Sequence, residues 1–191
     1  MASNDRIILD EVLEQRQSKI DPTASASSFF EFFTAEQVLK DFDLSYDEID
    51  SGLVGDGGDG GIDGIYLFIN GELVQEDPDY AYLKKDITLE LIILQSKTNP
   101  GFQETPVERF LTVSDDIFDL SRDPANFASS YNEALTEAIK RFRGGAPAVG
   151  GAIPDFAHFL LLCLKGHESC WERREKGGEA KSSCQEALSY C

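Results

Sequence analysis

Three side chains near the middle of the chain have the types and spacing that metal-assisted hydrolysis requires. Asp63 lies at the end of a glycine-dense loop, residues 52–64, and leads into an apolar run. A second apolar run, residues 89–97, carries Gln95 and Lys97 at its end. Side chains alternate along a strand, so Gln95 and Lys97 are expected to point the same way. A carboxylate, an amide and an ammonium group brought together could hold a divalent cation and a water beside a phosphodiester.

Hydrophobic patterns and turn signals predict the strands that position these groups. Residues 62–69 are expected to form a strand, followed by the hairpin signal Asn70-Gly71 and a return strand at 72–75. The Leu and Ile run at 88–95 is typical of a central strand buried on both faces. In the loop before the first strand, seven of thirteen residues are Gly. This density implies positive φ angles or a close approach of the backbone.

Helices are expected on both sides of these strands in the sequence. They show apolar residues at helical spacing, and Ser45 with Glu48 forms a capping-box pattern. The predicted helices cover residues 5–19, 26–41, 45–50, a segment beginning at Pro106, and 126–143. The order of helices, strand, hairpin, strand and helices predicts an α/β or α+β protein.

The charge of the chain limits its partners. The 191 residues have a formal net charge of −18, and residues 1–150 carry 12 Lys and Arg against 29 Asp and Glu. Such acidity disfavours nonspecific contact with nucleic acid or anionic membranes, and so weighs against a nuclease. No apolar run approaches the roughly 20 residues that span a bilayer. The polar start lacks the features of a signal peptide, so a cytoplasmic location without a membrane partner is expected.

The order of these motifs resembles a known group of nucleases. A strand that delivers Asp63, followed by a strand ending in Gln95-Ser-Lys97, is similar to the PD-(D/E)xK superfamily. The form GGIDG followed by QSK resembles its Mrr-type restriction endonuclease branch, in which Gln replaces the acidic residue. Longer segments resemble the N-terminal region of abortive infection phage resistance (AIPR) proteins over roughly residues 5–143: FFEFFTAEQVLKDFDLSYDEIDSG, GDGGDGGIDGIYLFINGEL and IILQSKTNPGF.

The resemblance implies a restriction-endonuclease-like core, with a small mixed sheet flanked by helices. It also implies metal-dependent cleavage of DNA, or of RNA, by a phage-defence protein. Asp63 and Gln95 would hold Mg²⁺, with Mn²⁺ as a substitute, and Lys97 would position water and stabilise negative charge. Glu36, on the helix before the loop, matches a further acidic position, and Glu31 is its rival. Gln95 departs from the acidic pattern, so cleavage rate and metal preference stay open.

Each of these residues also has a structural alternative. Asp63 could cap a turn, Lys97 could lie solvated at a strand end, and Gln95 could be structural. The run GDGGDGGID is similar to one copy of a repeat-type calcium loop, but tandem copies are missing. It also lacks the Gly-Lys-Ser/Thr ending of a phosphate-binding loop. The tail residues His158, Cys163, His167 and Cys170 match no common zinc-finger spacing.

Alternatives also remain for the whole chain. The runner-up function is a noncatalytic interaction or sensor module that keeps the nuclease fold, or an inactive fragment. The oligomeric state is open, and a homodimer is one arrangement. We expect a nuclease-like domain at 1–143, a Gly/Pro-rich linker at 144–155 and an irregular tail at 156–191. Since all four Cys lie in the last 29 residues and the periodicity is lost there, we hypothesise a truncated or frameshifted gene product. The coding DNA after the codon for Gly150 would decide this hypothesis.

Overall fold

The fold is of the mixed α/β class that the sequence predicts. The computed structural model describes residues 4–55, 57–75, 80, 87–97, 104–123, 126, 129–148 and 157–164. The elements, in chain order, are α1 (Asn4–Ile20), α2 (Ala26–Val38), the 3₁₀ helix η1 (Lys40–Phe42), α3 (Tyr46–Asp50), β1 (Gly64–Ile69), β2 (Glu72–Leu73), β3 (Leu89–Lys97), α4 (Glu104–Phe118), α5 (Glu133–Ala148) and β4 (Ala157–Leu164).

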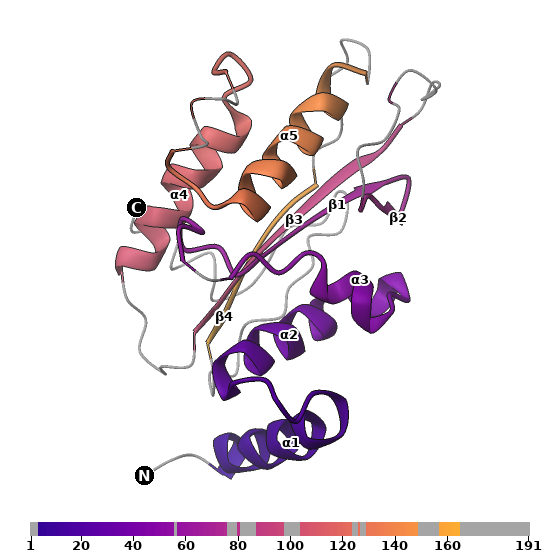
Figure 1. Ribbon diagram of the computed structural model, residues 1–191, viewed down its shortest axis with the longest axis vertical. Coiled ribbons are helices and arrows are strands. Elements are labelled where there is room, and N and C mark those ends of the chain that lie inside the picture. Colours follow the sequence, from indigo (N-terminus) through magenta and orange to yellow (C-terminus); the bar gives the residue numbers. More distant parts are fainter. Residues whose placement is uncertain are drawn as a thin grey trace, which may run out of the picture.

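The four strands form one mixed sheet between two layers of helices (Figure 1). The strand order is β2-β1-β3-β4, in which β1 is antiparallel to β2 and β3, and β4 is parallel to β3. Helices α2 and α3 cover one face of the sheet, and α4 and α5 cover the other (Figure 1). The predicted hairpin is present, with positive φ angles at Asn70 and Gly71.

Alternation along β1 and β3 supplies an apolar core on each side of the sheet. Odd-numbered strand residues, among them Ile65, Leu67, Leu91 and Ile93, pack with residues of α4 and α5. Even-numbered residues, among them Tyr66, Phe68, Ile92 and Leu94, pack with the phenylalanines of α2. The long apolar run predicted to be buried on both faces is therefore central in the sheet. Gln95 and Lys97 follow the odd-numbered set, so they belong to the face that α4 and α5 cover.

The helices begin at capping residues that the sequence makes visible. Ser45 and Glu48 form the predicted capping box at α3. Ser25 caps α2 by accepting a hydrogen bond from the main-chain N–H of Ser28. None of the helices in the described part of the chain has the length and apolar character needed to cross a bilayer.

Two predictions for the last third of the chain need correction. Residues 157–164, expected to be part of an irregular tail, form β4 and pair with β3 along its length. Helix α5 begins at Glu133, not at residue 126, and continues to Ala148, so the first residues of the predicted linker are helical. The later start follows from Asn132, whose side-chain oxygen accepts the main-chain N–H of Leu135 and so caps the helix. Residues 165–191, with His167 and Cys170, lie outside the described part of the chain.

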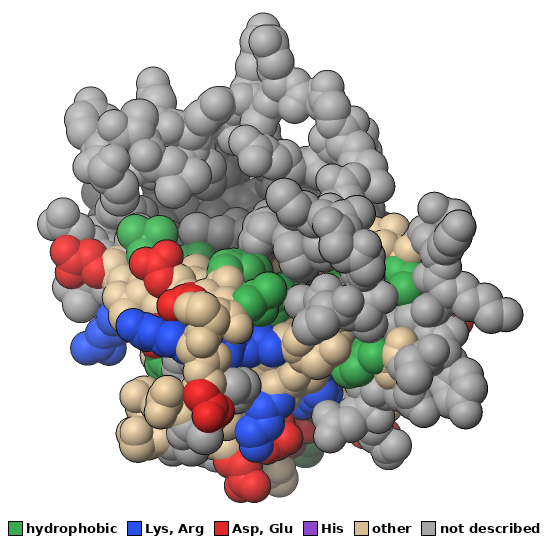
Figure 2. Space-filling model, turned by 90° about the horizontal axis from the view of Figure 1, so that it is seen from above, with side chains coloured by type: hydrophobic (Ala, Val, Ile, Leu, Met, Phe, Trp, Pro, Cys, Tyr) green, Lys and Arg blue, Asp and Glu red, His purple; other side chains and the backbone are tan. Residues whose placement is uncertain are grey.

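Charged side chains of both signs mix on the molecular surface. On the end of the molecule that Figure 2 shows, Lys and Arg side chains lie among Asp and Glu side chains. Arg122 pairs with Asp116 and Asp119, and Lys140 pairs with Glu137. Some of the basic groups are therefore already paired with acidic neighbours.

Candidate active site

A short stretch of backbone holds Asp63 at the start of β1. The N–H of Val54 donates to the carbonyl of Asp63 at 3.1 Å, and the N–H of Ile65 donates to the carbonyl of Gly52 at 2.8 Å. On the other side, the N–H of Asp63 donates to the carbonyl of Leu94 at 2.9 Å. The main chain of Asp63 is thus fixed between the loop and β3, which gives its side chain a defined origin.

The glycine-dense loop reaches this position because four of its residues adopt conformations that other residues avoid. Gly57, Gly58, Gly60 and Gly61 all have positive φ angles between 63° and 86°. At Gly60 a side chain would also overlap Val113 of α4. The glycines therefore serve a tight path of the backbone against α4, which supports the predicted reason for their density.

Asn132 attaches the same loop to the start of α5. Its amide nitrogen donates to the carbonyls of Val54, Gly55 and Gly57 at 2.7, 3.0 and 3.2 Å. Its main-chain N–H donates to the carbonyl of Gly58 at 2.7 Å. One side chain therefore fixes both the helix start and the loop that delivers Asp63. Sequence reasoning missed Asn132, which lies inside the helix predicted at 126–143, because its contacts with the loop are not local.

The carboxylate of Asp63 replaces a missing partner of β3. The chain turns away from β3 at Ile62, whose N–H bonds the carbonyl of Asp59 at 3.0 Å. Asp63 Oδ2 accepts the main-chain N–H of Ser96 at 2.5 Å and the hydroxyl of Ser96 at 3.0 Å. Both hydrogen bonds fall on one carboxylate oxygen, which leaves Oδ1 as the oxygen for a further ligand. Asp63 therefore has a structural contact, but it is with β3 and is not the turn cap that was its structural alternative.

The electrostatics of Asp63 combine burial with a nearby cation. Burial raises the pKa of the Asp63 carboxyl above its usual range, because the charged form loses solvation. The hydrogen bonds from Ser96 and the positive charge of Lys97 act in the opposite direction. Lys97 therefore lies close enough to Asp63 to influence its ionisation, as the proposed site requires.

Gln95 lies at the same end of the sheet and is almost fully buried, with 1% of its surface exposed. Its amide nitrogen donates to the carbonyl of Gly61, in the loop just before Asp63. This hydrogen bond directs the Gln95 side chain toward the loop. It is a structural role, the alternative to metal binding that the sequence leaves open. By strand alternation Lys97 shares its face. The structure thus brings Asp63, Gln95 and Lys97 to one end of the sheet.

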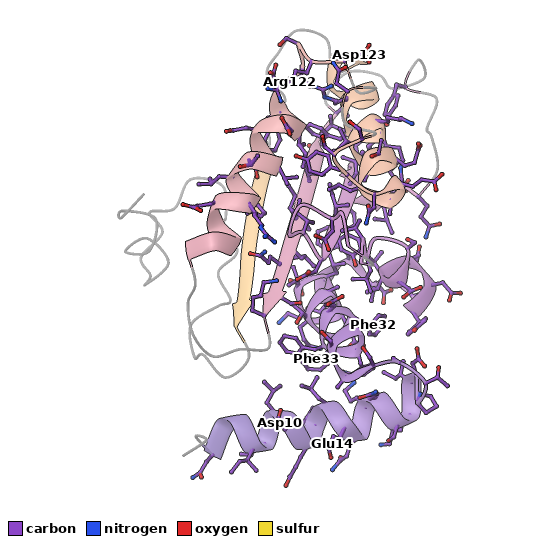
Figure 3. The ribbon with its side chains drawn as sticks, turned by 60° about the vertical axis from the view of Figure 1, so that its left-hand side comes forward. Asp10, Glu14, Phe32, Phe33, Arg122 and Asp123 are labelled. Carbon is purple, nitrogen blue, oxygen red and sulfur yellow. The ribbon has the colours of Figure 1, made fainter. Side chains whose placement is uncertain are left out.

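Glu36 is not brought to these three residues. Its carboxylate pairs with Arg16 of α1 at 2.6 Å, on the side of α2 that faces away from the sheet. Figure 3 shows α1, with Asp10 and Glu14, beyond α2, with Phe32 and Phe33. The rival Glu31 lies nearer the loop, because its Oε2 is 4.0 Å from the point where a side chain at Gly55 would begin. Of the two predicted acidic positions on this helix, Glu31 is the one beside the glycine loop.

The site offers carboxylate and amide oxygens, which are the type of ligand that a hard cation binds. Within the described residues no group of three or more His, Cys, Asp and Glu side chains could hold a metal ion. Mg²⁺, however, is often held by one or two carboxylates, with waters and substrate phosphates as its other ligands. Asp63 Oδ1 is one such carboxylate oxygen, and Gln95 adds an amide oxygen. Asp59 belongs to the run that is similar to a calcium loop. Its carboxylate accepts the N–H of Gly61 at 2.7 Å and so closes a local turn.

No family model matches the chain, and no curated protein and no solved structure is significantly similar to it.

Proposed function

We propose that this chain is a metal-dependent nuclease domain with a restriction-endonuclease-like core, of the kind found in AIPR phage-defence proteins. The observation that carries the proposal is that Asp63 and Lys97 lie at one end of the sheet, close enough for the charge of Lys97 to oppose part of the rise that burial causes in the pKa of the Asp63 carboxyl. A small mixed sheet between two helical layers is the architecture that this class of nuclease requires. The preferred substrate is DNA, with RNA as the alternative.

Each residue has a role that its surroundings support. Asp63, held through Oδ2 by Ser96, would present Oδ1 to Mg²⁺, or to Mn²⁺ in its place. Gln95 would add its amide oxygen, and Glu31 is the acidic side chain near the loop. When bound, the cation would supply a polarised phosphoryl oxygen and a more acidic water. Lys97 would orient the attacking water and stabilise the charge that develops on the phosphorus oxygens.

The raised pKa of Asp63 has a consequence for activity. A carboxyl group must be ionised to bind a metal ion. Because burial raises the pKa of Asp63, the cleavage rate should fall as the pH is lowered, and this fall should begin at a pH above the usual pKa range of Asp. Measuring the rate from pH 3 to pH 8 at a Mg²⁺ concentration well below saturation, where protons compete with the metal ion for the carboxylate, checks this. A rate that is constant down to the usual Asp pKa would contradict the assignment of Asp63 as the ligand.

The direct test is cleavage of end-labelled single-stranded DNA, duplex DNA and RNA with Mg²⁺, with Mn²⁺ and with EDTA. Asp63→Asn and Lys97→Ala should each lower the rate by about 100-fold or more, as the loss of one transition-state contact does. Lys19→Ala, which removes a charge from α1, serves as the control and should retain the wild-type rate. Equal rates in all four proteins would assign the cleavage to a contaminant and refute the proposal.

A noncatalytic sensor module is the second candidate, and two observations favour it. The side chains of Asp63 and Gln95 both bond the main chain, so the fold can use them without any catalysis. In addition, a cavity of about 340 Å³ lies between α5 and the edge of the sheet. Its lining combines the apolar Val54, Ile65 and Leu67 with the charged Glu133, Glu137 and Arg141. Folded wild-type protein that cleaves none of the three substrates with either metal ion would favour this candidate.

A further inference from the structure

Arg109 of α4 lies against the loop that delivers Asp63. A side-chain carbon added at Gly61 would lie 3.5 Å from Arg109 Cβ and 3.7 Å from Arg109 Cδ. The same carbon would lie 3.3 Å from the amide nitrogen of Gln95. Gly61 therefore lies between the side chain of Gln95 and the aliphatic part of the Arg109 side chain. The missing side chain at Gly61 allows an arginine from the helical layer to approach the candidate site.

Arg109 differs from the other arginines in what its guanidinium contacts. Arg16 and Arg122 pair with carboxylates, and Arg141 and Arg143 donate to main-chain carbonyls. Among the arginines whose side chains the structure describes, Arg109 is the one without an ion pair or hydrogen bond to another described residue. Its side chain is also exposed. An arginine without a described ion-pair partner at this place is unexpected in a chain with a formal net charge of −18.

We propose that Arg109 binds a phosphate of the nucleic acid strand next to the scissile bond, an inference that rests on the proposed nuclease function. A guanidinium presents a planar fork of donors that matches two phosphate oxygens, and it stays charged at any working pH. Lys97 would act at the scissile phosphate, and Arg109 would hold a neighbouring one. Two cations at one edge would let an otherwise acidic domain bind a polyanion at a single place.

Binding without cleavage tests this inference. A fluorescein-labelled single-stranded DNA of 20 nucleotides is titrated in EDTA, and its anisotropy is followed from 25 to 200 mM salt. Arg109→Ala should weaken binding about 10-fold at low salt and lower the salt slope by about 0.7, the value for one lost phosphate contact. Arg109→Lys should fall between the wild type and Arg109→Ala, because it keeps the charge but loses the fork. Lys19→Ala makes the same change in net charge on α1 and should leave the slope unchanged.

The outcomes separate this inference from the proposed function. Equal binding by Arg109→Ala and Lys19→Ala, or no measurable binding by folded wild type, overturns the role of Arg109. An Arg109-dependent slope without cleavage in Mg²⁺ or Mn²⁺ upholds phosphate binding and refutes the nuclease. Cleavage that depends on Asp63 but not on Arg109, with an unchanged slope, upholds the nuclease and refutes the inference.

Discussion

Replacing Asp63 by Asn and by Ala separates the charge of this side chain from its hydrogen bonding. In the wild type, Oδ2 of Asp63 accepts two hydrogen bonds from Ser96, a residue with only 7% of its surface exposed. Asn keeps an acceptor oxygen at this place and removes the charge, whereas Ala removes both. A buried donor left without an acceptor costs about 1–3 kcal/mol. Asp63→Ala should therefore be less stable than Asp63→Asn by about 1–3 kcal/mol at pH 7.

The dependence on pH has a definite sign. Since burial raises the pKa of Asp63 above its usual 3.8 in the folded chain, the folded state binds this proton more tightly than the unfolded state. Wild-type stability relative to Asp63→Asn should therefore decrease as pH rises from below 3.8 through the raised value, and then level off. A buried charge that costs stability and is needed for activity is typical of a functional site.

Urea unfolding of the three proteins, followed by far-ultraviolet circular dichroism between pH 4 and pH 8, measures both effects. Equal stability of Asp63→Ala and Asp63→Asn would show that the bonds from Ser96 contribute nothing. Wild-type stability that rises with pH relative to Asp63→Asn would show that the charge of Lys97 outweighs the burial of the carboxyl. Either result would refute our description of the Asp63 environment.

Three other substitutions test how the loop and the core are held. Asn132→Ala removes the α5 cap and three loop contacts, so urea unfolding should show a loss of about 2–3 kcal/mol. Gly60→Ala should cost about 2–4 kcal/mol, because the new methyl group overlaps Val113 at a positive φ angle. Its control Gly57→Ala, with open space around it, should cost only about 1 kcal/mol in the same experiment. Tyr66→Phe should lower stability by about 1 kcal/mol, because the buried hydroxyl donates to a main-chain carbonyl at 2.7 Å. Equal losses for the two glycine variants would contradict the close packing of the loop on α4.

Local patterns were sufficient to predict β1, β3 and the hairpin with β2, but not β4. The Asn70-Gly71 turn needs two positive φ angles that these residues tolerate, and both are observed. The common face of Gln95 and Lys97 follows from alternation, which no tertiary contact can change within a regular strand. The long apolar run could be placed inside the sheet because both of its faces are apolar.

Contacts between distant segments could not be predicted from the sequence. Asn132 bonds the carbonyl of Val54 across 78 positions, which no local pattern reveals. The choice between Glu31 and Glu36 was open for a related reason. They are five positions apart, so they point roughly 140° apart around the helix. Tertiary packing decides which of them faces the loop, and Glu36 instead forms an ion pair with Arg16 of α1.

The central claim is that the buried carboxylate of Asp63 and the ammonium group of Lys97 cooperate in hydrolysis. Single-turnover cleavage of end-labelled DNA by the wild type and Asp63→Asn, both shown to be folded, tests it most directly. We predict cleavage by the wild type that requires Mg²⁺ and a rate at least about 100-fold lower for Asp63→Asn. Equal rates for the two proteins, or no cleavage by the folded wild type of DNA or RNA with either metal ion, would contradict the claim.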